Sequence, residues 1–159
     1  MTNPVTIELR PGQNLTNRDK VVNLLSEAED YIWISNWYFS AKHLVILGES
    51  ISENKNISEI KLLLKIGKSV VDLEKLKTWL DLFKKQYKFE NIKIKMLTDK
   101  KIGEKEHDRY YFTKDQIWNF IELDTLLRNQ RATIALLQGG DYEQNKKDFE
   151  SLWNNEKSL

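Results

Sequence analysis

The chain has 159 residues, of which 40% are hydrophobic and 31% are charged, and its formal net charge is +1. This composition is typical of a globular protein with one hydrophobic core, and it excludes a largely disordered chain. Because the sequence has no cysteine, it excludes disulfides, thiolate metal sites and a cysteine nucleophile, and it fits a reducing compartment. We therefore expect a single domain that spans residues 1–159.

The sequence predicts neither a membrane anchor nor a signal peptide. No stretch approaches the ~18 consecutive apolar residues that a membrane span needs. The N-terminal stretch, MTNPVTIELRPG, has no apolar signal core and carries an acidic residue early. We expect a cytoplasmic protein without a transmembrane segment.

The first part of the chain alternates between strand patterns and helix patterns. Residues 16–19, TNRD, resemble a capping box with Asp19 in place of the usual Glu, and they predict the start of a helix. The run DYIWIS is rich in residues that favour strands and predicts a central strand. The apolar run over 41–52 fits a helix better than a strand. The predicted elements are a strand at 5–9, a helix at 17–29, a strand at 30–35, a helix at 41–52 and a strand at 58–67.

The second part of the chain continues this alternation. Between Asp72 and Lys88 the apolar residues keep a strict 3-4-3-4 spacing, which is the strongest helix signal in the sequence. The elements that follow are a strand at 91–97, a hairpin of 108–113 and 116–123 that turns near Lys114-Asp115, a strand at 131–140 and a C-terminal amphipathic helix that contains Tyr142, Phe149, Leu152 and Trp153. Strands that alternate with helices predict an α/β sandwich, with a largely parallel sheet covered by helices.

Basic residues exceed acidic residues between Lys84 and Arg109, nine against five, which leaves this stretch at +4. One interpretation is a solvated face in a lysine-rich composition. The other is a basic rim that draws phosphodiesters toward His107. The charge excess alone does not separate the two interpretations.

The stretch GEKEHDRYYFTKD, residues 103–115, carries the candidate site. His107 and Arg109 lie two residues apart, so their side chains point to the same face if the segment is a strand. A histidine beside a fixed cation suits a phosphate site. The alternative is the polar start of a buried strand. His43, the other histidine of the chain, is predicted to be a helix residue without a role in a site.

The order of the elements, with YIWISNWYF at 31–39 and HDRYYFT at 107–113, resembles the phospholipase D-like superfamily. The signature of that family is His-x-Lys, four residues and then Asp, followed downstream by Gly-Ser and often Asn. The closing segments LLRNQRATIALL and DFESLW resemble the end of those domains. The layout is also similar to the MIT-protein C-terminal domain, a phospholipase D-like module. The resemblance implies a sandwich with a mixed, mostly parallel sheet flanked by helices.

The chain departs from the family pattern at several positions. Arg109 stands where the family has Lys, and Asp115 lies one residue late, with Lys114 at the expected place. No Gly-Ser follows the motif. By a loose alignment, Thr125 is the nearest hydroxyl in a plausible position and Asn129 takes the place of the family's Asn. The resemblance thus implies that these two residues and Arg109 bind phosphate.

The resemblance also implies a mechanism. His107 would attack phosphorus and form a phosphohistidine, while Arg109 would bind the phosphoryl oxygens through its planar fork. Asp108 or Asp115 would orient the imidazole, and no metal or cofactor is expected. The family mechanism uses two histidines, and this chain has one motif. A complete site would therefore require a C2 homodimer that brings two copies of His107 together.

Two functions remain open from the sequence. The first is a phosphodiesterase that acts on nucleic acid rather than on lipid, because the chain has no amphipathic membrane-binding helix. The second is a catalytically silent module that binds a phosphate-bearing ligand or a protein. A metal nuclease with Glu59 and Lys61 as its Glu-x-Lys pair is weaker, since no Asp precedes them at a strand end. A serine hydrolase would need Gly-x-Ser-x-Gly, which is absent.

Overall fold

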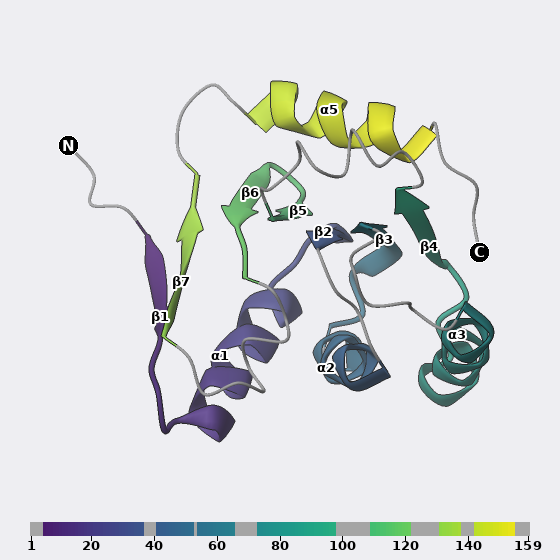
Figure 1. Ribbon diagram of the computed structural model, residues 1–159, viewed down its shortest axis with the longest axis horizontal. Helices are drawn as coiled ribbons and strands as arrows, with labels where there is room; N and C mark the ends of the chain where they lie inside the picture. Colours follow the sequence, from purple (N-terminus) through teal and green to yellow (C-terminus); the bar gives the residue numbers. More distant parts are fainter. Residues whose placement is uncertain are drawn as a thin grey trace.

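The computed structural model describes residues 5–36, 41–52, 54–65, 73–97, 109–121, 131–137 and 142–154. The elements in chain order are β1 (Thr6–Leu9), α1 (Asn14–Ser26), β2 (Asp30–Asn36), α2 (Ala41–Ser52), β3 (Ile57–Lys65), α3 (Leu73–Tyr87), β4 (Ile92–Leu97), β5 (Tyr110–Thr113), β6 (Gln116–Asn119), β7 (Ala132–Leu136) and α5 (Tyr142–Asn154). The strands form one seven-stranded sheet with the order β1-β7-β6-β5-β2-β3-β4. Helices α1, α2 and α3 cover one face of this sheet, and α5 lies across the other (Figure 1).

The α/β sandwich with a mixed sheet is confirmed, but the expected majority of parallel pairs is wrong. Among the described strands, β2–β3 and β3–β4 pair in parallel. The pairs β1–β7, β2–β5, β5–β6 and β6–β7 are antiparallel. The strict alternation of strand and helix holds from β1 to β4, and within it α2 and α3 form the crossovers between parallel strands. Strands β5 and β6 form a hairpin, and β7 pairs with β1 at the edge of the sheet.

The predicted capping box at residues 16–19 is also wrong. Helix α1 begins at Asn14, and its N-cap residue, Gln13, makes no side-chain cap hydrogen bond. The side chain of Asn17 is instead buried and forms hydrogen bonds with the preceding loop. It donates from Nδ2 to the Arg10 carbonyl at 2.8 Å and accepts from the Arg10 N–H at 3.1 Å. The TNRD stretch therefore lies inside the helix, where the Asn17 side chain holds the turn that leads from β1 into α1.

Each face of the sheet has its own hydrophobic core. The larger core lies between the sheet and α1, α2 and α3, and it includes fully buried residues such as Ile32, Leu62 and Leu76. The second core lies under α5 and is mainly aromatic. In it the Phe149 ring stacks on Trp33, with ring centroids 5.3 Å apart. Helix α5 thus docks on the sheet through large rings, which leave room along its flanks.

Gly48 in α2 packs directly against the ring of Tyr87 in α3. A Cβ atom at Gly48 would overlap the ring of Tyr87 in α3. We expect Gly48→Ala to lower the free energy of unfolding by about 1–3 kcal/mol through overpacking, although alanine normally favours a helix over glycine by about 1 kcal/mol. Urea denaturation measures the change. In a Tyr87→Ala background the same substitution should be neutral or stabilising, and an equal cost in both backgrounds would contradict the contact.

Candidate functional site

The candidate site lies where β5 begins beside the carboxyl end of β2. Strands β2, β3 and β4 are parallel, so their carboxyl ends meet at one edge of the sheet. Strand β5 runs antiparallel to β2 and pairs Tyr110 with Ser35. Arg109 directly precedes Tyr110 and therefore lies at that same edge. Ligands of α/β proteins bind outside the carboxyl ends of such strands.

The backbone of Arg109 is held in place, and its guanidinium is partly screened from water. The Arg109 carbonyl accepts the Phe120 N–H at 2.8 Å, which ties it to the end of β6. The residue is half-buried, and its Nε atom is fully buried. A fixed charge in partly desolvated surroundings attracts an anion more strongly than one in bulk water does. Arg109 thus supplies a positioned cation at the edge of the sheet.

The other predicted site residues divide between two places. His107, Thr125 and Asn129 lie outside the described residues, as does Asp108. Asp115 lies in the β5–β6 turn, with a left-handed backbone at φ 60°. Strand β5 separates Asp115 from Arg109, and its four residues span about 13 Å. The structure therefore does not bring Asp115 and Arg109 together.

Asp115 lies near the N-terminal end of α5. The Tyr31 and Tyr142 hydroxyls share a hydrogen bond of 2.7 Å there. Burial raises the pKa of Tyr31 well above its usual value, and the Tyr142 hydrogen bond and the charges of Asp115 and Glu150 raise it further. The Tyr31 hydroxyl therefore stays neutral and holds α5 to β2 as a hydrogen-bonding group.

A cleft of about 170 Å³ opens beside Tyr110, between the sheet and one flank of α5. Its aromatic side consists of Tyr110, Phe112 and Phe149. Its polar side consists of Ser35, Asn145 and Asp148, of which the two from α5 lie one helical turn apart. Sequence reasoning missed this cleft, because Asn145 and Asp148 resemble ordinary polar residues of an amphipathic helix. Asn145 and Asp148 line a cleft only because β5 places Tyr110 beneath the same side of α5.

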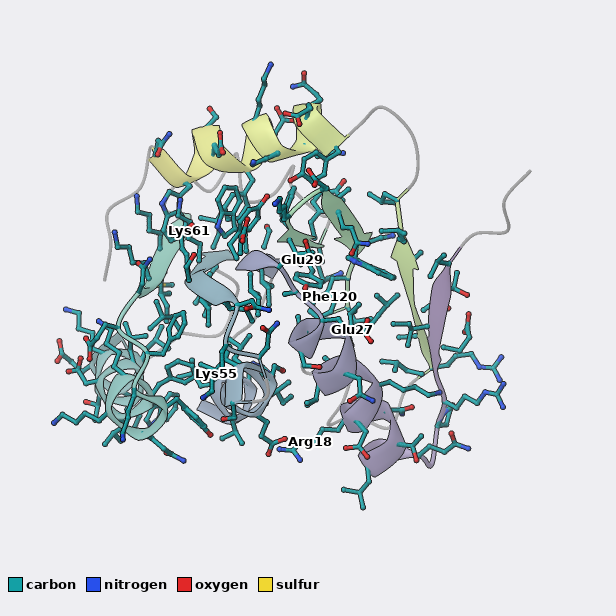
Figure 2. All side chains as sticks on the ribbon, turned by 180° about the vertical axis from the view of Figure 1, so that it is seen from behind. Arg18, Glu27, Glu29, Lys55, Lys61 and Phe120 are labelled. Carbon is teal, nitrogen blue, oxygen red and sulfur yellow. The ribbon has the colours of Figure 1, made fainter. Side chains whose placement is uncertain are left out.

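Glu59 and Lys61, the weaker metal-nuclease pair, belong to the aromatic core under α5 instead. Glu59 accepts the Trp33 indole N–H at 2.8 Å. The Lys61 Nζ lies 3.8 Å from the Glu59 carboxylate and 4.6 Å from the centre of the Trp33 ring, on the α5 side of β3 (Figure 2). Among the described residues, no three His, Asp or Glu side chains lie close enough together to hold a metal. These contacts give the pair a role in packing.

The described basic residues of the stretch from 84 to 109 do not gather around Arg109. Lys84 and Lys85 lie in the last turn of α3, near the amino end of β4. Lys93 is exposed on β4, and the Lys95 Nζ donates to the Trp153 carbonyl at 2.9 Å near the end of α5. For these residues the structure favours a solvated and partly structural role.

The structure also bears on His43 and on the expected absence of a membrane span. His43 lies in α2 as predicted, in its first turn, and is 1% exposed. No helix in the described part of the chain is long and apolar enough to cross a membrane.

No protein-family model matches the sequence, and no curated protein matches it. Solved structures do resemble it. The chain is similar to Nuc from Salmonella typhimurium, a phospholipase D family member, with a TM-score of 0.66 and 10% identity over 99% of both chains. It is also similar to NucT from Helicobacter pylori, with a TM-score of 0.61 and 12% identity over 99% of both chains.

A third similar structure is TrmBL2, an archaeal chromatin protein, with a TM-score of 0.56 and 14% identity. The match covers 97% of this chain and 53% of TrmBL2, so this chain spans about half the length of that protein. Identities this low report on the fold alone. The likeness to Nuc extends over nearly all of both chains, and it agrees with the resemblance seen in HDRYYFT and the order of elements. The chain therefore has the fold of the phospholipase D-like superfamily.

Proposed function

We propose that the protein is a phosphodiesterase that cleaves nucleic acid through a phosphohistidine at His107, without a metal ion. The observation that supports this proposal most is the position of Arg109, a half-buried residue at the carboxyl edge of β2. His107 precedes Arg109 by two residues in the sequence. The fold shared with Nuc supports phosphodiester chemistry, and the DNA binding reported for TrmBL2 supports a nucleic acid as the partner.

The proposed reaction has two displacements. The imidazole of His107 attacks phosphorus, and the bond from phosphorus to the leaving oxygen breaks. Arg109 binds the phosphoryl oxygens, whose charge grows in the transition state. The leaving oxygen takes its proton from the partner's His107 in a C2 homodimer, because arginine does not give up a proton. Water then attacks the phosphohistidine and gives its proton to the partner's His107, while the bond from phosphorus to the imidazole breaks, which frees His107 and a phosphate monoester.

Three further residues have assigned places in the proposal. Thr125 and Asn129 bind phosphate oxygens beside Arg109. Asp115 lies at the far end of β5, so we assign it a positioning role in the turn that aligns β5 with β6. An Asp adopts the left-handed backbone of this turn more easily than most residues do.

The second candidate function is a catalytically silent module that binds a phosphate-bearing ligand or a protein. The arginine at the family's lysine position and the absent Gly-Ser favour it. Such a module would keep the phosphate contact of Arg109 and lose turnover.

The proposal is tested by cleavage of single- and double-stranded DNA and RNA, and of bis(p-nitrophenyl) phosphate, in excess EDTA. We expect cleavage by the wild-type protein, because the nucleophile is a side chain rather than a metal-bound water. Arg109→Ala should reduce kcat/KM by about 100- to 1,000-fold, as loss of a transition-state contact does. Arg109→Lys should retain activity. Lys77→Ala, which removes an exposed cation from α3, should have no effect.

The alternative outcomes are distinct. Cleavage that depends on added Mg²⁺ and is unchanged in Arg109→Ala would overturn the proposed mechanism. No cleavage of any substrate, together with oligonucleotide binding that is lost in Arg109→Ala, would support the silent module.

A further inference from the structure

The cleft under the flank of α5 adjoins the proposed phosphate site. Tyr110 lines this cleft, and Arg109 is its immediate neighbour in the chain. Tyr110 packs with the aromatic core under α5, and Arg109 precedes it at the carboxyl edge of β2. A nucleic-acid strand that crosses this edge can therefore contact Arg109 and place a base in the cleft.

The described lining of the cleft does not suit a phosphate group. Of the described residues that line it, Asp148 alone is charged, and the charge is negative. Asp148 lies exposed at the mouth, where its carboxylate accepts the Gln144 side-chain amide at 2.9 Å and keeps further acceptor capacity. Asn145, from the preceding turn of α5, adds an amide that both donates and accepts. The polar side thus suits a neutral group with N–H donors.

The size and the aromatic lining of the cleft suit one ring system. Phe112 and Phe149 are nearly fully buried and close the inner end. Tyr110 is only half-buried, so part of its ring remains accessible to a ligand. Ligand sites for larger molecules run to about 300–1,000 Å³, and the cleft, at about 170 Å³, has room for one ring system. An aromatic wall opposite hydrogen-bonding groups is the arrangement that recognises an unstacked nucleobase.

We propose that this cleft binds one nucleobase of the nucleic acid, with Tyr110 as the stacking surface and Asn145 and Asp148 as readers of the base edge. This inference rests on the proposed function for the phosphate at Arg109. Guanine is the expected base, because its Watson–Crick edge presents two adjacent N–H donors to a carboxylate and an oxygen to the Asn145 amide. Uracil and thymine present a single N–H between two oxygens, which the carboxylate repels.

The test titrates nucleosides, which carry no phosphate, into isotope-labelled protein and follows the spectrum by NMR. Guanosine should shift the side-chain amide signals of Asn145 and the backbone signal of Tyr110, with a Kd about tenfold below that of uridine. Asp148→Asn should bring the two Kd values within about twofold, and Tyr110→Leu should abolish the shifts. Asp81→Asn, a matched change at an exposed position of α3, should leave both Kd values unchanged.

Cleavage of single-stranded DNA with one guanine in an otherwise thymine-only sequence separates this inference from the proposed function. Guanosine binding without cleavage of any substrate would support the base site and contradict the catalytic proposal. Cleavage in EDTA at equal rates next to every base, with no nucleoside-induced shift at Asn145, would overturn the base site and leave the catalytic proposal standing. Loss of both readouts would overturn both.

Discussion

Replacing His107 with alanine is expected to abolish cleavage in excess EDTA, with a fall in kcat of at least about a thousandfold. The proposed reaction passes through a covalent bond to this imidazole, and removal of a nucleophile costs most of the rate enhancement that a site provides. Initial rates on an oligonucleotide and on bis(p-nitrophenyl) phosphate measure the loss. In a His107→Gly variant, added imidazole should restore part of the rate, because it replaces the missing nucleophile.

The fold should survive the same substitution. HDRYYFT begins with polar residues, so His107 is expected to carry little core packing. Urea denaturation should give a midpoint close to that of the wild-type protein. Activity that persists in His107→Ala would contradict the phosphohistidine. Lost activity combined with lost stability would instead indicate a structural histidine.

His107 also tests whether the protein forms a dimer, because the chain carries only one copy of the motif. In a C2 dimer each phosphate would meet two copies of His107. We expect light scattering to show a dimer, and mixed dimers of wild-type and His107→Ala chains to be inactive, so activity should fall with the square of the wild-type fraction. A monomer at high concentration would leave only the silent module.

Phe149→Ala is expected to lower the free energy of unfolding by about 3–5 kcal/mol. Phe149 is 4% exposed and lies at the centre of the aromatic core under α5. Its ring centroid lies 5.3 Å from those of Trp33 and Phe112 and 6.0 Å from that of Trp153. The substitution removes the shared partner of three rings and leaves a cavity that rigid aromatic neighbours do not fill. Urea denaturation measures the loss.

Two controls make this result specific to the aromatic core. Lys147→Ala, at an exposed position of the same helix, should change stability by less than about 0.5 kcal/mol. Phe149→Leu keeps part of the volume and should cost less than Phe149→Ala. A cost below about 1 kcal/mol for Phe149→Ala would show that α5 adds little to the stability of the domain.

Most elements of the fold were predictable because their signals are local. The 3-4-3-4 spacing of Leu73, Leu76 and Leu80 predicted α3 to within a residue or two. The strand-forming runs on both sides of Lys114-Asp115 predicted the β5–β6 hairpin, and DYIWIS predicted β2. Side-chain periodicity depends only on neighbouring residues, so a single sequence carries it in full. The resemblance to the phospholipase D-like fold came from the order of these elements and from one short motif.

The candidate site was predictable only in part, because strand pairing joins distant residues. The sequence by itself determined that a cation, Arg109, follows a histidine by two residues. Only the tertiary structure decided that β5 pairs with β2 in the antiparallel direction, which places Tyr110 beside Ser35 and Arg109 at the carboxyl edge. Direction and register are set by burial of whole strand faces, which no local pattern encodes. The same pairing put Asp115 at the far end of β5, and the docking of α5 through Phe149 brought Asp148 to the cleft.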